Sequence, residues 1–476
     1  MKNCSQVLLY TVYNFSNIPH KPVKVSWKMK IYFGFAESDI EPVDFRTSLA
    51  GYFNERPRTG SLDPLRVRAV CMRDRTGRLF ALIQFDLVTV TDALAAGVFD
   101  SPELPEGIDR SNLLLTATHT HTAPEIRDGK PGVNSRYRDF VAAIAVRTLV
   151  NAVNSLRPGS LWRADGTASH LGFNRRYLMR DGSVKTNPGK GNPEVVAPEG
   201  KNDETIPVLL FRDAAGVPAG IIANIVNHSD TIGGTRSSAD WPGRFIRKLR
   251  GHFGENFFAA ALIGCAGNIN HIDLDNPDPQ CSEVEAERIG IAYAEAVMRI
   301  LEHAIELPEA EFEIFNPVLE MPPREYSEAE LREARETVEK YRDLPAAEST
   351  GRELTAVELA AGDPVVLRFF AENLLRAAAA ARPSRFPLIG IRFGRSGIIA
   401  LPCEPFVEIG LELKKIFPGA LVVSHTNSCG GEYFTGGYIP IASAYDRGGY
   451  EDRPRSSPYS KRTGAALVEM WKKMLC

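Results

Sequence analysis

The chain has 476 residues and a formal net charge of −3, because 56 Lys and Arg oppose 59 Asp and Glu, and 44% of its residues are hydrophobic. A nearly balanced charge argues against a nucleic-acid partner, and apolar runs far shorter than the ~20 residues of a membrane helix argue against a transmembrane segment. The seven cysteines contain no CxxC pair, which argues against a cysteine-based zinc knuckle and favours a reducing compartment. We expect a globular cytoplasmic protein, and the sequence does not indicate its oligomeric state.

Residues 1–28 are expected to be a disordered or non-native extension. Residues 6–14 are only briefly apolar and no small-residue cleavage site comes after them, so we expect no secretory signal peptide. Strand and turn signals begin only after residue 28. We expect one α/β domain made of residues 29–324 and 384–476, interrupted by a helical insertion at 325–383.

Strand-like and helix-like segments alternate along the chain, which predicts an α/β fold with a mixed β-sheet core flanked by helices. Apolar residues at helical spacing predict a helix over 282–303, whereas residues 166–206 lack periodicity and are rich in Gly, Asn and Pro, which predicts a long loop. Strands, several of them buried, are predicted at Leu65–Met72, Leu79–Val90, Asn112–Thr118, Ile206–Phe211, Pro218–Val226 and Phe257–Ile263.

The segment before Pro383 has a different composition. Ser327 and Glu330 have the spacing of a capping box, and Glu, Arg, Ala and Leu dominate the residues up to Pro383, which predicts helices with a solvated face and no catalytic role. Beyond it we expect a hairpin (386–392 and 397–401), a helix (405–417), a strand (420–426) and an amphipathic C-terminal helix docked on the sheet (457–476).

The most specific local pattern is ATHTHTAP, which contains His119 and His121 at the end of an apolar run. Residues two apart on a strand point to the same face, so both histidines can face one site at the carboxyl end of the strand, where open α/β sheets place their sites. Paired histidines also occur as hydrogen-bonded core residues. The pattern HxHxDH is absent and no eightfold βα repeat comes after the motif, which argues against metallo-β-lactamase-like and amidohydrolase-barrel sites.

Further polar residues lie at the ends of other predicted strands. His228 ends the run NIVNH, and it can supply a second ligand because catalytic zinc typically takes three protein ligands. Asp240, in SADWPG, is either a helix N-cap or a carboxylate that orients a ligating histidine. Glu404 lies between a strand and a helix, a position that by itself favours a first-turn carboxylate stabilised by the helix dipole. Tyr438 and Tyr450 lie in a glycine-rich segment.

Together these motifs resemble the catalytic domain of the neutral/alkaline, non-lysosomal ceramidase family. ATHTHTAP, NIVNHS with SADWPG, LPCEP, GYIP and GGYE occur in the family's order and approximate spacing, and GFAESDIEP near the start is also similar. The resemblance covers about residues 31–455. It implies a ceramidase-like α/β catalytic domain and a zinc-dependent hydrolase that uses metal-activated water to cleave the amide bond of a ceramide-like N-acyl substrate.

The resemblance also implies roles for individual residues. Because metal-binding tyrosine must be at least partly phenolate, the ion has to lower a pKa near 10. The twelve-residue spacing between Tyr438 and Tyr450 matches two tyrosines of the family. By this match one Zn²⁺ per chain is bound by His119, His228, Glu404 and Tyr438, with His121 and Tyr450 beside the scissile amide and Arg175 in contact with the substrate.

The sequence departs from the family pattern in three ways. Cys403 stands where the family commonly has glycine, Ala123 replaces the glycine of THTHSGP, and we expect no counterpart of the family's C-terminal immunoglobulin-like domain. Two alternatives stay open: a deacylase or esterase of the same fold that acts on a soluble non-lipid substrate, and a catalytically inactive binding protein. The other histidines, His425 among them, have no ligand spacing and are interpreted as surface or core residues.

Overall fold

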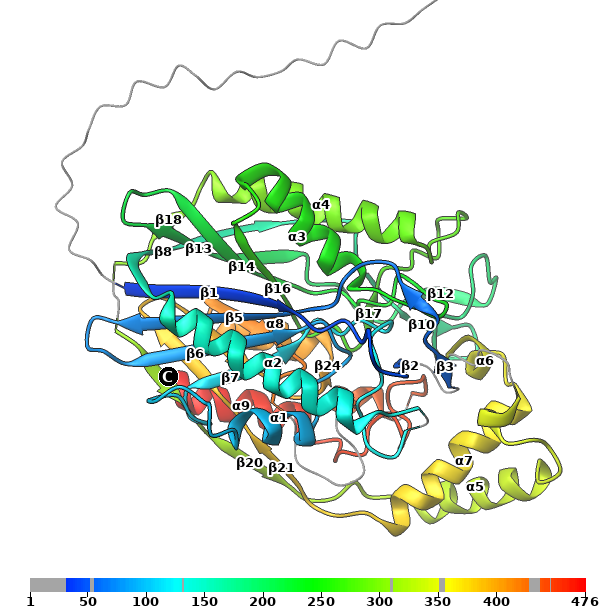
Figure 1. The fold of residues 1–476 in the computed structure, drawn as a ribbon. Helices are drawn as coiled ribbons and strands as arrows, with labels where there is room; N and C mark the ends of the chain where they lie inside the picture. The colour runs from blue at the N-terminus through cyan, green and yellow to red at the C-terminus, as the bar shows by residue number, and fades with distance from the viewer. Residues whose placement is uncertain are drawn as a thin grey trace, which may run out of the picture.

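The computed structural model describes residues 31–51, 55–130, 132–308, 311–350, 356–427, 437–445 and 447–476. The extension predicted at residues 1–28 lies outside this range. Within the described residues one large mixed sheet has the strand order β16-β14-β13-β8-β1-β5-β6-β7, with β18 paired to β8 (Figure 1). Its strands are β1 (Ile31–Asp39), β5 (Arg66–Asp74), β6 (Leu79–Phe85), β7 (Leu113–Ala117), β8 (Arg157–Thr167), β13 (Thr205–Asp213), β14 (Pro218–Ile225), β16 (Phe258–Ile263) and β18 (Ile305–Glu306).

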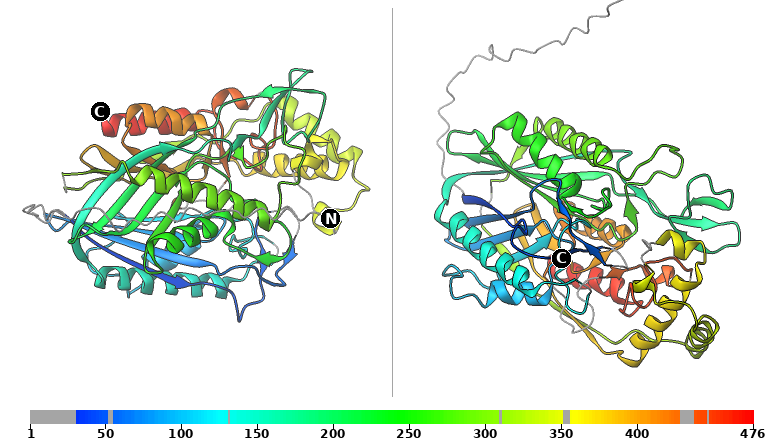
Figure 2. Two further views of the ribbon diagram at one scale, coloured as in Figure 1. Left: turned by 90° about the horizontal axis from the view of Figure 1, so that it is seen from above. Right: turned by 45° about the vertical axis from the view of Figure 1, so that its right-hand side comes forward.

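A second sheet packs against the first. Its order is β19 (Glu313–Phe315), β22 (Gly390–Phe393), β23 (Ser396–Ala400) and β25 (Ala420–Val423). Helices α1 (Asp92–Phe99), α2 (Ser135–Asn154), α3 (Asp240–Phe253) and α4 (Glu283–Leu301) cover the outer face of the large sheet, and α8 (Val407–Ile416) and α9 (Thr463–Leu475) cover that of the second. Figure 2, left, shows these layers from above. The predicted mixed sheet flanked by helices is confirmed.

Strand β5 illustrates why the predicted strands are apolar at almost every position. Val67, Ala69 and Cys71 pack under α1 and α2, whereas Val70 and Met72 pack against the second sheet. Successive side chains on a strand point to opposite faces, so a strand between two layers needs apolar residues on both. The layer order is therefore α/β/β/α, with one apolar core between the sheets and others beneath the helices.

The prediction of a long loop at 166–206 is wrong, because part of this segment forms short strands. Strands β10, β11 and β12 pair in the order β11-β10-β12, and β9 pairs with β17. Their two to four residues are too short to show alternation, and turn residues such as Asp181, whose carboxylate accepts from the Ser183 N–H at 2.9 Å, separate them. The bounds are β9 (Phe173–Asn174), β10 (Arg176–Met179), β11 (Val184–Thr186), β12 (Val195–Pro198) and β17 (Ile269–Asn270).

Other boundaries shift by a few residues. The strand predicted to end at Val90 ends at Phe85, because the Asp86 carboxylate accepts from the Arg66 N–H and pairs with the Arg68 guanidinium. The helix predicted from Pro405 begins at Val407. The remaining strands are β2 (Ser48–Leu49), β3 (Arg56–Pro57), β4 (Gly60–Ser61), β15 (Arg236–Ser237), β20 (Val318–Met321), β21 (Ser384–Pro387), β24 (Glu404–Pro405) and β26 (Tyr438–Ile439).

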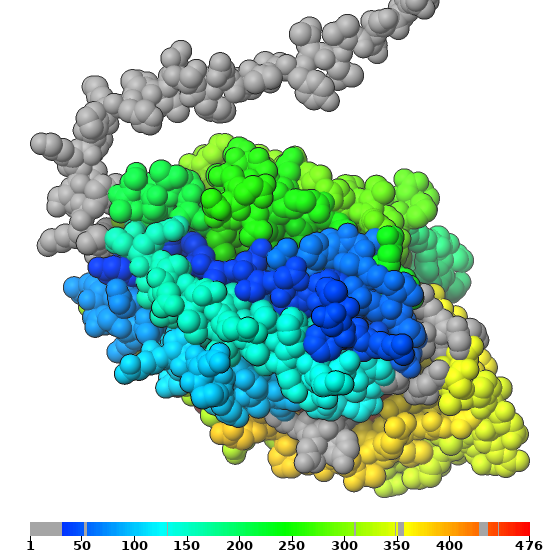
Figure 3. All heavy atoms as spheres, in the orientation of Figure 1, coloured from blue at the N-terminus to red at the C-terminus, as the bar shows by residue number. Residues whose placement is uncertain are grey.

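Helices α5 (Glu328–Lys340), α6 (Ala356–Ala360) and α7 (Pro364–Ala379) lie in the range predicted as helical. Ser327 and Glu330 form the predicted capping box. This helical segment, drawn in yellow, lies at the lower right of the molecule in Figures 1 and 3. It has an apolar cluster of its own that includes Phe370, against which Tyr450 packs. No helix in the described ranges is long and apolar enough to cross a membrane.

Candidate metal centre

Four polar side chains meet where strands of the two sheets end. His119 lies after β7 and His228 after β14 in the large sheet, while Glu404 and His425 lie after β23 and β25 in the second. The Leu115 N–H donates to Asn427 Oδ1 at 2.8 Å, which ties the two sheets together at this edge. In the large sheet β7 is parallel to β6 and β14 is parallel to β16, and in the second sheet β23 is parallel to β25. The carboxyl ends of each parallel pair therefore lie at the same edge of their sheet. The site therefore lies at the junction of both sheets, as expected for α/β proteins.

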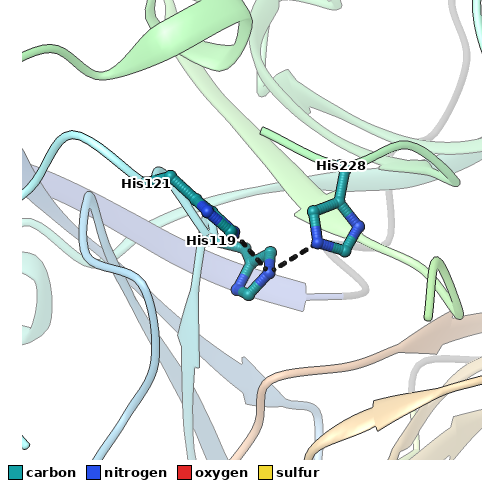
Figure 4. A group of neighbouring side chains, drawn as sticks. All are labelled: His119, His121 and His228. Atoms are coloured by element: carbon teal, nitrogen blue, oxygen red, sulfur yellow. Dashed lines mark hydrogen bonds between the residues drawn. The ribbon is translucent and has the colours of Figure 1, made fainter. Parts of the chain in front are cut away.

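The Nε2 atoms of His119 and His228 point toward each other, and the two ring planes are 81° apart. His119 Nδ1 donates to the Val88 carbonyl at 2.7 Å and His228 Nδ1 donates to the Ala266 carbonyl at 3.1 Å. Their Nε2 atoms are 3.0 Å apart (Figure 4). Both residues are at most 3% exposed. Because the carbonyl contacts hold the proton on each Nδ1, the two Nε2 lone pairs point at one another.

The second histidine of the motif reaches the same point. His121 Nε2 lies 3.1 Å from His119 Nε2, and His121 Nδ1 lies 3.5 Å from Asp230 Oδ1. Figure 4 shows all three rings converging. Burial, together with the neighbouring His119, lowers the pKa of His121 well below its usual range, so this ring is neutral at pH 7. The sequence prediction that both histidines face one site agrees with this placement.

Glu404 closes the cluster from the second sheet. Its Oε2 lies 3.4 Å from His119 Nε2 and 3.6 Å from His228 Nε2. That oxygen is buried and makes no hydrogen bond within the described residues. Burial alone raises the pKa of a carboxyl, but the surrounding histidines hold the pKa of Glu404 well below its ordinary value. The pocket therefore favours an anion at Glu404 and a positive charge beside it.

The donor set fits a metal ion. Two imidazole nitrogens and a carboxylate oxygen within 3.6 Å of one another need a proton or a metal ion between them to avoid repulsion of their lone pairs. Histidine nitrogen and carboxylate oxygen are ordinary zinc ligands, and backbone carbonyls that fix the far nitrogen of each ring are typical of metal-binding histidines. Groups that could hold an ion are His119 with His121 and His228, and His119 with Glu404 and His425.

His425 is the residue of this cluster that the sequence interpretation missed. Its ring stacks on that of His119, with centroids 3.9 Å apart and planes 20° from parallel. It lies at the end of a predicted strand, as His119 and His228 do, but a single histidine at a strand end is most often a core residue. The shared strand-end position was the available signal, and only the sheet order shows that β25 ends at the same place.

Tyr438 and Tyr450 both lie beside the cluster. Strands β24 and β26 are parallel and bring Glu404 and Tyr438 into register. The rings of Tyr438 and Tyr450 are 5.5 Å apart at 76°. Burial, reinforced by Glu404, raises the pKa of Tyr438 well above 10 despite the nearby Arg175. In the absence of a cation at the cluster, Tyr438 is therefore a phenol rather than a phenolate.

Arg175 lies under Tyr438 and is held by protein groups. Its Nε donates to Glu451 Oε1 at 2.8 Å and its Nη2 donates to the Gly267 carbonyl at 2.7 Å. The guanidinium carbon is 5.2 Å from the centre of the Tyr438 ring. The residue predicted to contact the substrate is thus adjacent to the site, with Glu451 as its ion partner.

Asp240 is placed differently from both of its predicted roles. The N-cap of α3 is Ala239, so the cap interpretation is wrong. Among the described residues, the Asp240 carboxylate makes no hydrogen bond to the His228 ring. Instead Oδ2 accepts from the Thr231 and Ile232 N–H groups at 2.9 and 3.0 Å, which holds the loop after His228. Trp241 Nε1 donates to the His228 carbonyl at 2.8 Å, so the start of α3 fixes the backbone of His228.

Unusual backbone conformations gather at the cluster. His119, Cys403 and His425 have φ values of 60°, 62° and 52°, in the left-handed region that costs a non-glycine residue of order 1–3 kcal/mol. This explains why glycine suits the position of Cys403, where the sequence departs from the ceramidase pattern. Such strain is typical of functional sites, because the surrounding structure must hold each residue in place.

The structure is that of an α/β protein with a buried cluster of histidine and glutamate side chains that could hold a metal ion. No family model matches the chain. Over 211 residues it is 26% identical to the neutral ceramidase of Pseudomonas aeruginosa, a match that covers 42% of this chain and 30% of that protein. The aligned part therefore spans less than a third of the curated relative's length.

Solved structures of ceramidases have the same fold. A structure described as "Ceramidase complexed with C2" has a TM-score of 0.69 at 18% identity, covering 94% of this chain and 75% of the other. The neutral ceramidase from Pseudomonas aeruginosa gives 0.68 at 18% identity, covering 94% and 74%. The sequence match to a neutral ceramidase and the fold shared with the solved ceramidase structures agree with the resemblance found in the motifs.

Proposed function

We propose that the chain is a zinc-dependent amide hydrolase of the neutral ceramidase type, with a ceramide-like N-acyl lipid as substrate. The observation that carries the proposal is the 3.0 Å approach of His119 Nε2 to His228 Nε2, with the Nδ1 of each ring on a backbone carbonyl and Glu404 Oε2 beside them. Three ligands would come from these residues, and the resemblance implies Tyr438 as the fourth. A bound zinc ion supplies a Lewis acid that acidifies water and polarises an amide carbonyl.

His121 is suited to proton transfer. Asp230 Oδ1, 3.5 Å from His121 Nδ1, favours a proton on that nitrogen and leaves Nε2, which faces the cluster, as the acceptor. Nε2 takes one proton from the attacking water and returns it to the leaving nitrogen. Water thereby adds its oxygen to the acyl carbon, the carbon–nitrogen bond breaks, and a free amine and a carboxylic acid leave.

Tyr450 is suited to stabilise the oxyanion. Burial raises the pKa of its phenol, which therefore stays protonated and can donate a hydrogen bond. Its ring lies between Tyr438, at 5.5 Å, and Phe370 of α7, at 6.0 Å. These aromatic surroundings support an apolar acyl chain beside the reacting amide.

Metal analysis and substrate comparison test the proposal. Purified protein is expected to contain about one zinc per chain, to lose activity with a chelator and to regain it with Zn²⁺. Metal-replete protein is expected to release fatty acid from a short-chain fluorescent ceramide faster than acetate from N-acetylated sugars. Hydrolysis of the sugars alone would refute the lipid substrate, and metal-replete protein that cleaves neither would refute the hydrolase.

A further inference from the structure

Glu451, the last residue of the motif GGYE, is a fully buried carboxylate next to Tyr450. Its Oε1 accepts from Arg175 Nε at 2.8 Å. Its Oε2 accepts from Arg176 Nη1 at 2.9 Å and from Thr186 Oγ1 at 2.7 Å. A charge that is removed from water is tolerated only where such partners replace its hydration. The carboxylate therefore joins the loop that carries Tyr450 to the segment that forms β10 and β11.

Thr186 connects this carboxylate to the backbone of Tyr450. The Thr186 hydroxyl donates to Glu451, and the same oxygen accepts from the Tyr450 N–H at 2.9 Å. Because a hydroxyl has one proton, the bond to Glu451 turns the lone pairs of Thr186 toward the Tyr450 N–H. Thr186 is 2% exposed, so water does not compete for either bond. The position of Tyr450 therefore depends on a hydroxyl that Glu451 orients.

The same carboxylate sets the direction of the Arg175 guanidinium. Arg175 donates from Nε to Glu451 and from Nη2 to the Gly267 carbonyl at 2.7 Å. A planar guanidinium held on two of its edges cannot turn freely. In this orientation its central carbon lies 5.2 Å from the centre of the Tyr438 ring. Glu451 thus fixes a second group beside the candidate site.

Arg176 holds the other side of the carboxylate. It is fully buried, and its Nη2 donates to the Gly448 carbonyl at 2.9 Å. A Cβ at Gly449 would overlap Arg176 Nη1, which explains a glycine at this position of the motif. Burial alone raises the pKa of a carboxyl, but the two guanidinium groups hold the pKa of Glu451 below its ordinary value. Glu451 is therefore an anion that the loop encloses.

We propose that Glu451 is a positioning residue, which holds Tyr450 and Arg175 where the proposed reaction requires them. The inference rests on the proposed function, because it concerns the side chains expected beside the amide. Within the described residues Glu451 makes no hydrogen bond or ion pair to the histidine and glutamate cluster. Its effect on catalysis therefore passes through Tyr450 and Arg175 and leaves metal binding intact.

A double-mutant cycle tests the assignment. Glu451→Gln keeps the shape of the side chain and removes its charge, so it is expected to lower kcat for the N-acyl substrate at least about tenfold. Zinc affinity is expected to stay at the wild-type value. In a Tyr450→Phe background the loss caused by Glu451→Gln is expected to be about threefold smaller or less still, because the phenol that it positions is already gone. A merely structural role would give equal losses in both backgrounds.

Glu37→Gln is the matched control. The Glu37 carboxylate also lies between two guanidinium groups, with Arg68 Nε at 2.9 Å and Arg250 Nη1 at 3.0 Å. Both variants are expected to lower the free energy of unfolding, because each leaves buried guanidinium groups short of an anion. Only Glu451→Gln is expected to lower kcat.

Thr186→Val covers the case in which Glu451→Gln fails to fold. Valine has nearly the shape of threonine and leaves the ion pairs of Glu451 in place, but it lacks the hydroxyl that holds the Tyr450 N–H. We expect kcat to fall while zinc stays bound. Thr186→Ser keeps the hydroxyl and is expected to restore kcat.

Several outcomes would overturn the proposal. These are equal losses in the two backgrounds of the cycle, wild-type kcat in folded Glu451→Gln or in Thr186→Val, and loss of zinc from folded Glu451→Gln. If the wild type cleaves amides and one of these results is found, the positioning role alone is refuted. A metal-replete wild type that cleaves no amide would refute the proposed function and the positioning role with it.

Discussion

Glu404 and Tyr438 are direct neighbours across the parallel strands β24 and β26, although 33 residues separate them in the chain. The Glu404 N–H donates to the Gly437 carbonyl at 2.8 Å, and the Phe406 N–H to the Ile439 carbonyl at 3.0 Å. These two backbone hydrogen bonds fix the position of Glu404, and therefore where its carboxylate lies relative to the histidines. The carboxylate is the anionic member of the cluster, so its charge is the first feature to test.

Glu404→Gln is expected to lower zinc affinity at least about tenfold, because an amide oxygen cannot replace the anion that offsets the charge of the ion. Amide hydrolysis should fall in parallel and recover partly at high zinc concentration. Glu408→Gln is a control one turn away, since Glu408 contacts Asn268 at 3.0 Å and not the cluster. Equal zinc affinity in wild type and Glu404→Gln would contradict the assignment.

His121→Ala is expected to keep the bound metal and lose about 10²–10⁴-fold in kcat, the usual contribution of general acid–base catalysis. The reason is that His121 Nε2 faces the cluster, while its Nδ1 has Asp230 nearby. Metal content and steady-state kinetics on the same preparation separate the two effects. A variant that loses both zinc and activity would instead show that His121 is a ligand.

Asp240 predicts a pH dependence of stability. Burial raises its pKa from 3.8 to about 6. Because its pKa is higher in the folded state, the native protein binds more protons than the unfolded chain between about pH 4 and 6. Ionisation of Asp240 therefore lowers the free energy of unfolding as pH rises through this window. The total decrease is about 3 kcal/mol. Asp452 has the same direction of shift, also to about 6.

Asp240→Asn removes that contribution. We expect the difference in unfolding free energy, variant minus wild type, to increase between pH 4.5 and pH 7, while the slope due to Asp452 remains. Urea unfolding at several pH values measures it. A difference that stays constant over this range would show that Asp240 does not titrate there.

Phe370→Leu tests whether the helical segment shapes the site. Phe370 is 3% exposed and its ring meets Tyr450 at 6.0 Å. The smaller side chain is expected to raise KM for an N-acyl substrate several-fold, because Tyr450 loses its edge-to-face partner. Phe369→Leu is the matched control, since Phe369 packs under the Arg455 guanidinium instead. The same KM in wild type and Phe370→Leu would restore the prediction that the segment has no catalytic role.

Much of the fold could be predicted because burial on two faces leaves a local signature. Strands such as β7 and β14 are apolar at most positions because they lie between layers, and the capping box at Ser327 is a contact between residues three apart. The motif around His119 was readable for the same reason, since its two histidines are neighbours in the chain. Short strands such as β10 carry no such pattern, and the segment containing it was taken for a loop.

The tertiary structure alone decided which distant residues share the site. The position of His425 at a strand end does not by itself mark it as a site residue, and nothing local shows that the Asp240 carboxylate holds the loop after His228 rather than the His228 ring. Those facts depend on sheet order, which sets β25 beside β23 and joins both to the end of β7. Which residues bind one ligand depends on where their side chains lie in the folded chain, whereas a sequence pattern reflects only local structure and burial.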